Sequence, residues 1–126
     1  MVAGLLGVES GQYAVIRAYL YESRKFLVPP YPVTVTEFTN RISGLGNRLG
    51  KEGTTSEGLV VAQSEGAEGK ISGNLLAGDK DSLAYAKEPA VILRIVYGTG
   101  NESMPGGFFP NGTNGVIARS FLSGTT

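Results

Sequence analysis

The stretch GVESGQYAVIRAYLYE, residues 7–22, decides how the first part of the chain folds. Large apolar residues recur there at spacings of three and four, a periodicity that favours one long helix. We expect this helix over residues 2–27, because prolines follow at once and the residue before a proline is pushed out of the α-helical conformation. The apolar positions of the pattern are Leu5, Val8, Val15, Ile16, Tyr19 and Leu20, and the prolines are Pro29, Pro30 and Pro32.

Two polar residues share one face of this helix. Glu9 lies three residues before Gln12, a spacing that places both side chains on the same face. A glutamate followed at this spacing by histidine holds a metal in four-helix carboxylate proteins. Here the second residue is glutamine, whose amide oxygen is a poor substitute for an imidazole nitrogen. Glu9 is therefore a weak metal candidate, and the pair is interpreted as buried groups that hydrogen-bond to neighbouring helices. Arg17 and Arg24 are expected on the wetter side of the helix.

The composition excludes several classes of function. The 126 residues fit at most one ordinary domain, and eleven basic residues balance eleven acidic ones. The even charge argues against a nucleic-acid partner. The chain has no cysteine and no histidine, which removes thiolate chemistry and the commonest general base. No apolar run reaches the ~20 residues of a membrane-spanning helix, and no signal peptide is recognisable. We expect no cofactor.

A second helix is expected to begin after Thr34. Thr34 and Glu37 match a capping box, in which each residue satisfies a backbone N–H of the other. An apolar stripe follows, which we expect to be the buried face by which this helix docks. Gly50 is the expected end of the helix. The stripe consists of Phe38, Ile42, Leu45 and Leu49.

The rest of the chain is rich in glycine, of which the sequence has nineteen. Residues 51–86 read as loop, and two short apolar runs within them allow one short strand pair. A third helix is expected to start at Pro89, which suits a first helical position, and to end at Gly98. The tail should be mostly turns, with a final short helix or docking segment that contains Ile117, Phe121 and Leu122.

The tail also holds two sequons for glycosylation of asparagine. Asn101 begins Asn-Glu-Ser, and Asn111 begins Asn-Gly-Thr. Two sequons in one exposed segment suggest a secreted protein, although such short patterns also arise by chance. Asn101 and Asn111 are therefore candidate modification sites.

Three stretches together resemble the plant desiccation-related protein family, which carries a ferritin-like domain. They are VAGLLGVESGQYAVIRAYLY, VTEFTNRISGLGNRLG and ILRIVYGTGNESMPGGFFPNGTNGVIARSFL. The resemblance covers nearly the whole chain. Because members of that family are much longer, it implies that residues 1–28 are the last helix of a ferritin-like bundle. Residues 29–126 would be the C-terminal extension of the family. The expected fold is thus mainly α with long irregular glycine-rich segments.

The resemblance also implies a function and a location. A water-deficit stress protein with a structural or protective, non-catalytic role is the main interpretation, outside the cell or in the cell wall. Its partners would be the missing upstream bundle helices, or a second copy through self-association. One alternative is a di-metal oxidase or catalase-like enzyme of the wider ferritin-like group. Another is an extracellular interaction module, with residues 98–110 binding a wall polymer or a protein.

Overall fold

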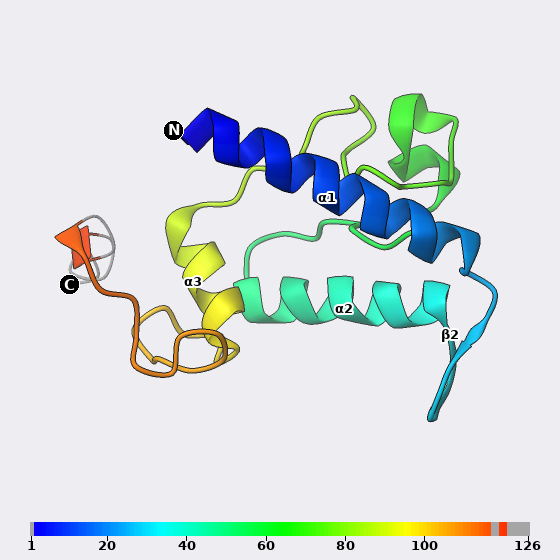
Figure 1. Cartoon of the computed structure of the whole chain (residues 1–126). Helices are drawn as coiled ribbons and strands as arrows, with labels where there is room; N and C mark the ends of the chain where they lie inside the picture. Colours follow the sequence, from blue (N-terminus) through cyan, green and yellow to red (C-terminus); the bar gives the residue numbers. More distant parts are fainter. Residues whose placement is uncertain (1, 117–118, 121–126) are drawn as a thin grey trace. The chain divides into compact units, whose positions relative to one another are not determined.

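A computed structural model describes residues 2–116 and 119–120 (Figure 1). The chain divides into two compact units. The first unit is Met1–Ser43 with Thr55–Tyr85, and the second is Gly44–Thr54 with Ala86–Thr126. The expected mainly helical chain is confirmed. The elements in chain order are the α-helix α1 (Val2–Glu22), the strands β1 (Leu27–Val28) and β2 (Tyr31–Thr34), the α-helix α2 (Val35–Gly50), the short 3-10 helices η1 (Gln63–Glu65) and η2 (Ala67–Gly69), and the α-helix α3 (Pro89–Tyr97).

The first helix ends earlier than the sequence predicts. α1 stops at Glu22 rather than at residue 27, because the backbone groups that follow bond to the start of α2. The carbonyl of Arg24 accepts hydrogen bonds from the backbone N–H and the hydroxyl of Thr36, at 3.1 and 3.0 Å. The carbonyl of Phe26 accepts one from the N–H of Val35 at 2.9 Å. These long-range bonds replace the last turn of the expected helix.

The strand pair lies elsewhere than predicted. We expected it within residues 51–86, but β1 and β2 pair in antiparallel fashion before that segment, with Leu27 opposite Thr34 and Val28 opposite Tyr31. Pro29 and Pro30, joined by a cis peptide bond, connect the two strands. Within residues 51–86 the strand-like pairing is limited to one isolated antiparallel bridge, between Val60 and Gly73. A two-stranded ribbon consists of edge strands alone, so it tolerates Pro32 within β2.

The capping box at the start of α2 is confirmed. The hydroxyl oxygen of Thr34 accepts a hydrogen bond from the N–H of Glu37 at 3.2 Å. In return, the carboxylate of Glu37 accepts bonds from the N–H and the hydroxyl of Thr34 at 2.7 and 2.9 Å. These bonds favour the ionised carboxylate and lower the pKa of Glu37. Because the box is local, four residues of sequence were enough to predict where α2 begins.

The buried face of α2 differs from the prediction. Ile42 and Leu45 of the expected docking stripe are 56% and 46% exposed, so the expectation is wrong for these two residues, whereas Phe38 and Leu49 at the ends of the stripe are half-buried. Two hydroxyls make the contacts instead. Thr39 accepts a bond from the N–H of Leu59 at 3.3 Å, and Ser43 donates to the carbonyl of Thr55 at 3.0 Å. The irregular segment needs partners for its backbone, which an apolar stripe cannot supply.

The third helix begins and ends where the sequence predicts. α3 starts at Pro89 and is closed by Gly98, whose φ of 68° is the left-handed conformation that glycine tolerates. Among the described residues of the second unit, Val91 and Tyr97 of α3 are the buried apolar ones. Gly50, at the end of α2, packs so closely that a β-carbon there would lie 3.0 Å from Val91 Cγ1. The predicted final helix at Ile117, Phe121 and Leu122 falls outside the described residues.

The capping box gives a direct test of local stability. Replacing Thr34 with alanine removes a side-chain acceptor at the N-terminus of α2, so we expect the free energy of unfolding to fall by ~1 kcal/mol. Urea unfolding followed by circular dichroism measures this. Thr54→Ala is the control, because Thr54 is exposed in a loop. Equal effects of the two substitutions would contradict the role of the cap.

Candidate functional site

A buried arginine on α1 binds the irregular segment of the first unit. Arg17 is 8% exposed, so the expectation that it lies on the wetter side of the helix is wrong. Its Nε donates to the carbonyl of Leu75 at 2.8 Å, and its Nη1 to that of Glu57 at 3.0 Å. Its Nη2 donates to the carbonyls of Gly58, at 2.9 Å, and Asn74. The planar guanidinium thus gathers four backbone carbonyls from two separate stretches of chain.

Asn74 completes this cluster from the opposite side. Its Nδ2 donates to the carbonyls of Ser56 and Gly58 at 3.0 and 2.9 Å, and its backbone N–H donates to that of Leu59 at 2.9 Å. Leu59 is fully buried, with no exposed surface. The carbonyl of Gly58 therefore accepts bonds from both Arg17 and Asn74. Polar groups that are removed from water in this cluster have found partners, as stable interiors require.

The other side of α1 is apolar and exposed. A helix turns by about 100° per residue, so Val8 points about 180° away from Arg17. Val15 and Tyr19, on the same side as Val8, are 71% and 72% exposed. Leu5 and Ile16 are also exposed large apolar residues of this face. We call this set, Leu5, Val8, Val15, Ile16 and Tyr19, the apolar face of α1.

Glu9 and Gln12 lie on or next to the apolar face. Both side chains are exposed in the described chain. The predicted contacts with neighbouring helices therefore need groups beyond those described, and a bundle-interior role for the pair stays a prediction. Among the described residues, no group of three or more acidic, histidine or cysteine side chains could hold a metal ion. The described helices include none that is long and apolar enough to cross a membrane.

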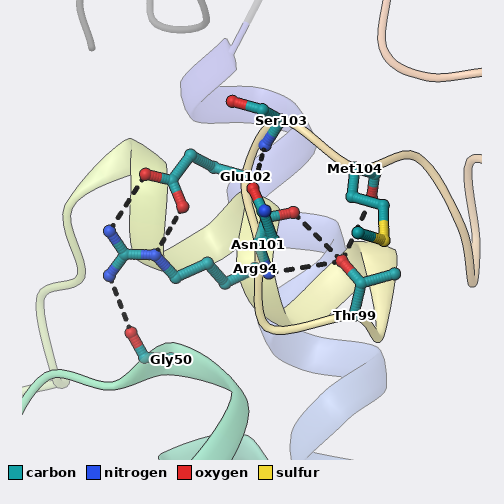
Figure 2. A network of polar contacts seen from close by, with 7 residues as sticks. All are labelled: Gly50, Arg94, Thr99, Asn101, Glu102, Ser103 and Met104. Atoms are coloured by element: carbon teal, nitrogen blue, oxygen red, sulfur yellow. Dashed lines mark hydrogen bonds and ion pairs between the residues drawn. The ribbon is translucent and has the colours of Figure 1, made fainter. Parts of the chain in front are cut away.

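The second unit holds a different polar network (Figure 2). Arg94 of α3 donates from Nε and Nη2 to the two carboxylate oxygens of Glu102, at 2.7 and 3.1 Å. Its Nη1 donates to the carbonyl of Gly50 at 3.0 Å. The guanidinium lowers the pKa of Glu102 to about 2, first through these hydrogen bonds. The carboxylate in turn raises the pKa of Arg94. This two-point ion pair fixes the loop after α3 against the end of α2.

The loop residues around Glu102 are tied to one another. The hydroxyl of Thr99 lies 3.0 Å from the carbonyl oxygens of both Asn101 and Met104, and the Oδ1 of Asn101 accepts a bond from the N–H of Ser103 at 2.9 Å (Figure 2). Asn101 and Asn111, the predicted modification sites, are both exposed. Sequence reasoning missed the ion pair and the Arg17 cluster. For Arg17, the available signal was a charged residue within an apolar helix.

Two curated relatives match almost the whole chain. A protein named ferritin-like catalase Nec2, from Nesocodon mauritianus, is 57% identical over 122 residues, which are 97% of this chain and 39% of that protein. The desiccation-related protein PCC13-62, from Craterostigma plantagineum, is 50% identical over 115 residues, which are 91% of this chain and 37% of that protein. No protein-family model matches the chain, and no solved structure matches it significantly.

These similarities place the chain among ferritin-like proteins. More narrowly, it belongs to the desiccation-related family of ferritin-like proteins, as the sequence resemblance indicated. The chain spans about two fifths of the length of the curated relatives it matches, that is 39% and 37%.

The Arg17 cluster predicts a large effect of substitution. Arg17→Met removes a buried charge and takes one hydrogen-bond donor from each of four backbone carbonyls, so the free energy of unfolding should fall by about 3 kcal/mol. Arg17→Lys keeps the charge but not the planar fork and should lose an intermediate amount. Arg41→Met on the exposed part of α2 is the matched control, expected within about 0.5 kcal/mol of the unsubstituted chain. Urea unfolding measures these free energies. An Arg17→Met variant that is as stable as the unsubstituted chain would exclude the cluster as a structural centre.

The ion pair in the second unit predicts a dependence on acid pH. The pKa of Glu102 lies at about 2 in the folded chain against an ordinary 4.5. Its ionised form therefore stabilises the fold fully above pH 4.5, and this contribution is lost as the pH falls towards 2. Glu102→Gln should flatten this part of the profile of melting temperature against pH, and Glu22→Gln on α1 is the control. An unchanged acid slope in Glu102→Gln would refute the assignment.

Proposed function

We propose that this chain supplies the last helix of a ferritin-like bundle and the extension that holds it, within a desiccation-related protein of structural or protective, non-catalytic role. In this proposal residues 1–28 are the bundle helix and residues 29–126 the extension. The observation that carries it is the contrast between the two sides of α1. Arg17 binds one side to the irregular segment, while the apolar face on the other side stays open.

The apolar face has the character of a bundle interior. Helices of a four-helix bundle bury apolar side chains against one another, and an exposed continuous apolar face is costly in water. The relatives are more than twice as long as the matched region, so they contain chain that could form the other helices. Glu9 and Gln12 would then enter the interior, where their polar atoms need partners from those helices.

The residue types on α1 favour a structural role over metal chemistry. The position three residues after Glu9 is Gln12, and the chain has no histidine. Amide oxygen binds transition metals weakly compared with imidazole nitrogen. We include an extracellular or cell-wall location in the proposal, supported by the two sequons at Asn101 and Asn111 and by the family resemblance.

A catalase-like enzyme is the second candidate. The observation in its favour is the 57% identity to a protein named as a ferritin-like catalase. In this case the metal ligands would come largely from other parts of the longer protein, with Glu9 as a contribution from α1.

Complementation tests the bundle role. We expect the chain to bind the part of Nec2 that it does not match, because that part would supply the helices for the apolar face. Size-exclusion chromatography with light scattering should give a one-to-one complex in place of self-associated chain. Val15→Asp on the apolar face should abolish the complex. Ser10→Asp, the same substituent on the other side of α1, should leave it intact. Failure to bind, or equal effects of both variants, would contradict the proposal.

Oxygen release from hydrogen peroxide separates the two candidates. The complex, supplied with iron or manganese, should release no oxygen above the metal control if α1 of this chain is non-catalytic. Complete Nec2 is the positive control. If the complex releases oxygen and the complex made with the Glu9→Gln variant does not, the result supports the catalase-like candidate. The same result excludes the non-catalytic role.

A further inference from the structure

The segment FFPNGT, residues 108–113, forms a tight turn around the second sequon. The N–H of Gly112 donates to the carbonyl of Phe109 at 2.9 Å, so Pro110 and Asn111 occupy the two central positions. Proline is favoured at the first of these positions. Gly112 follows with a φ of 79°, a left-handed conformation that glycine tolerates.

This turn is anchored on both sides. Before it, the N–H of Phe109 donates to the carbonyl of Gly106 at 2.9 Å, and the N–H of Gly106 donates back at 3.2 Å. After it, the hydroxyl of Tyr97 accepts a bond from the N–H of Thr113 at 2.9 Å and lies 2.8 Å from the hydroxyl of Thr113. Tyr97 is 1% exposed, so a buried group of α3 holds the end of the turn.

The turn carries an aromatic ring and an asparagine amide that are both exposed. Phe109 and Asn111 are the first and third residues of the turn, two positions apart. Phe109 is 45% exposed, and Asn111 is exposed. Within the described residues, no hydrogen bond occupies the side chain of Asn111. An exposed aromatic ring two residues before an exposed asparagine amide offers a surface on which the apolar face of a sugar attached to that amide can stack.

We propose that Asn111 carries an N-linked glycan whose first N-acetylhexosamine packs on the ring of Phe109. In the transfer, Nδ2 of Asn111 attacks the anomeric carbon of an oligosaccharide linked to a lipid pyrophosphate. The carbon–nitrogen bond forms, the bond from that carbon to the pyrophosphate oxygen breaks, and the lipid pyrophosphate leaves. One amide proton passes to a base of the transferase. Transfer precedes the contact between Thr113 and Tyr97, because in the folded unit Tyr97 engages the hydroxyl of Thr113 that the sequon requires. The turn of residues 109–112 is local and can form before that contact, so the ring of Phe109 is in place during transfer.

The first sequon is an internal comparison. Two residues before Asn101 stands Thr99, which has no ring. The third position is Ser103 rather than a threonine, and Oδ1 of Asn101 already accepts a bond from the N–H of Ser103. The acidic Glu102 stands between them. Asn101 therefore lacks the features that favour Asn111, although both are exposed on the same unit.

Glycan mapping on the whole chain tests the proposal. The full chain, directed by an added leader into a eukaryotic secretory pathway, is analysed by mass spectrometry with and without peptide N-glycosidase. We expect Asn111 to be occupied in most molecules and in at least threefold more molecules than Asn101. Phe109→Ala should lower the occupancy of Asn111 at least twofold and leave Asn101 unchanged. The backbone bonds of the turn do not need the ring, so this variant keeps the turn.

A second readout tests the packing of the sugar. Enzymatic removal of the glycan should lower the melting temperature of the glycosylated chain by a few degrees, and the same treatment of glycosylated Phe109→Ala should not. Where a variant is not secreted, translation in the presence of microsomes measures transfer without a need for folding. An unmodified Asn111, or equal occupancy with and without the ring of Phe109, would overturn the proposal.

Discussion

The guanidinium of Arg17 is the group on which the irregular part of the first unit depends. Residues 55–85 contain few regular elements, so their backbone groups must find partners outside a helix or sheet ladder. The guanidinium of Arg17 donates hydrogen bonds to four backbone carbonyls. The side chain of Asn74 donates two further bonds, one to the carbonyl of Ser56 and one to that of Gly58, which Arg17 also binds. A side chain with a planar set of donors can hold a segment that has no periodic structure. This arrangement explains how a glycine-rich stretch acquires one conformation.

The same helix is used differently on its two faces. Its polar contacts run through Arg17, whereas the apolar face of α1 remains open to solvent in the described chain. The two relatives match the chain over about two fifths of their own length. The contrast is what a terminal bundle helix would show if the extension bound its outer side and the other helices its inner side.

The second unit is organised around α3 and the loop after it. Arg94 and Glu102 join the loop to the carbonyl at the end of α2, and Tyr97 holds Thr113 further along. Glycines at 98 and 112, with φ of 68° and 79°, allow the tight reversals that bring these groups together. The result is a loop held at several points, in which the rings of Phe108 and Phe109 remain exposed.

The sequence by itself determined the features that depend on neighbouring residues. The capping box of Thr34 and Glu37, the start of α3 at Pro89 and its end at Gly98 follow from contacts within one or two turns. The family, too, could be read from the quoted motifs. Tertiary structure alone decided the burial of Arg17, the exposure of Ile42 and the pairing of β1 with β2. Each of these depends on which backbone groups, distant in the sequence, need hydrogen-bond partners. The spacing of residues along the chain does not predict those partners.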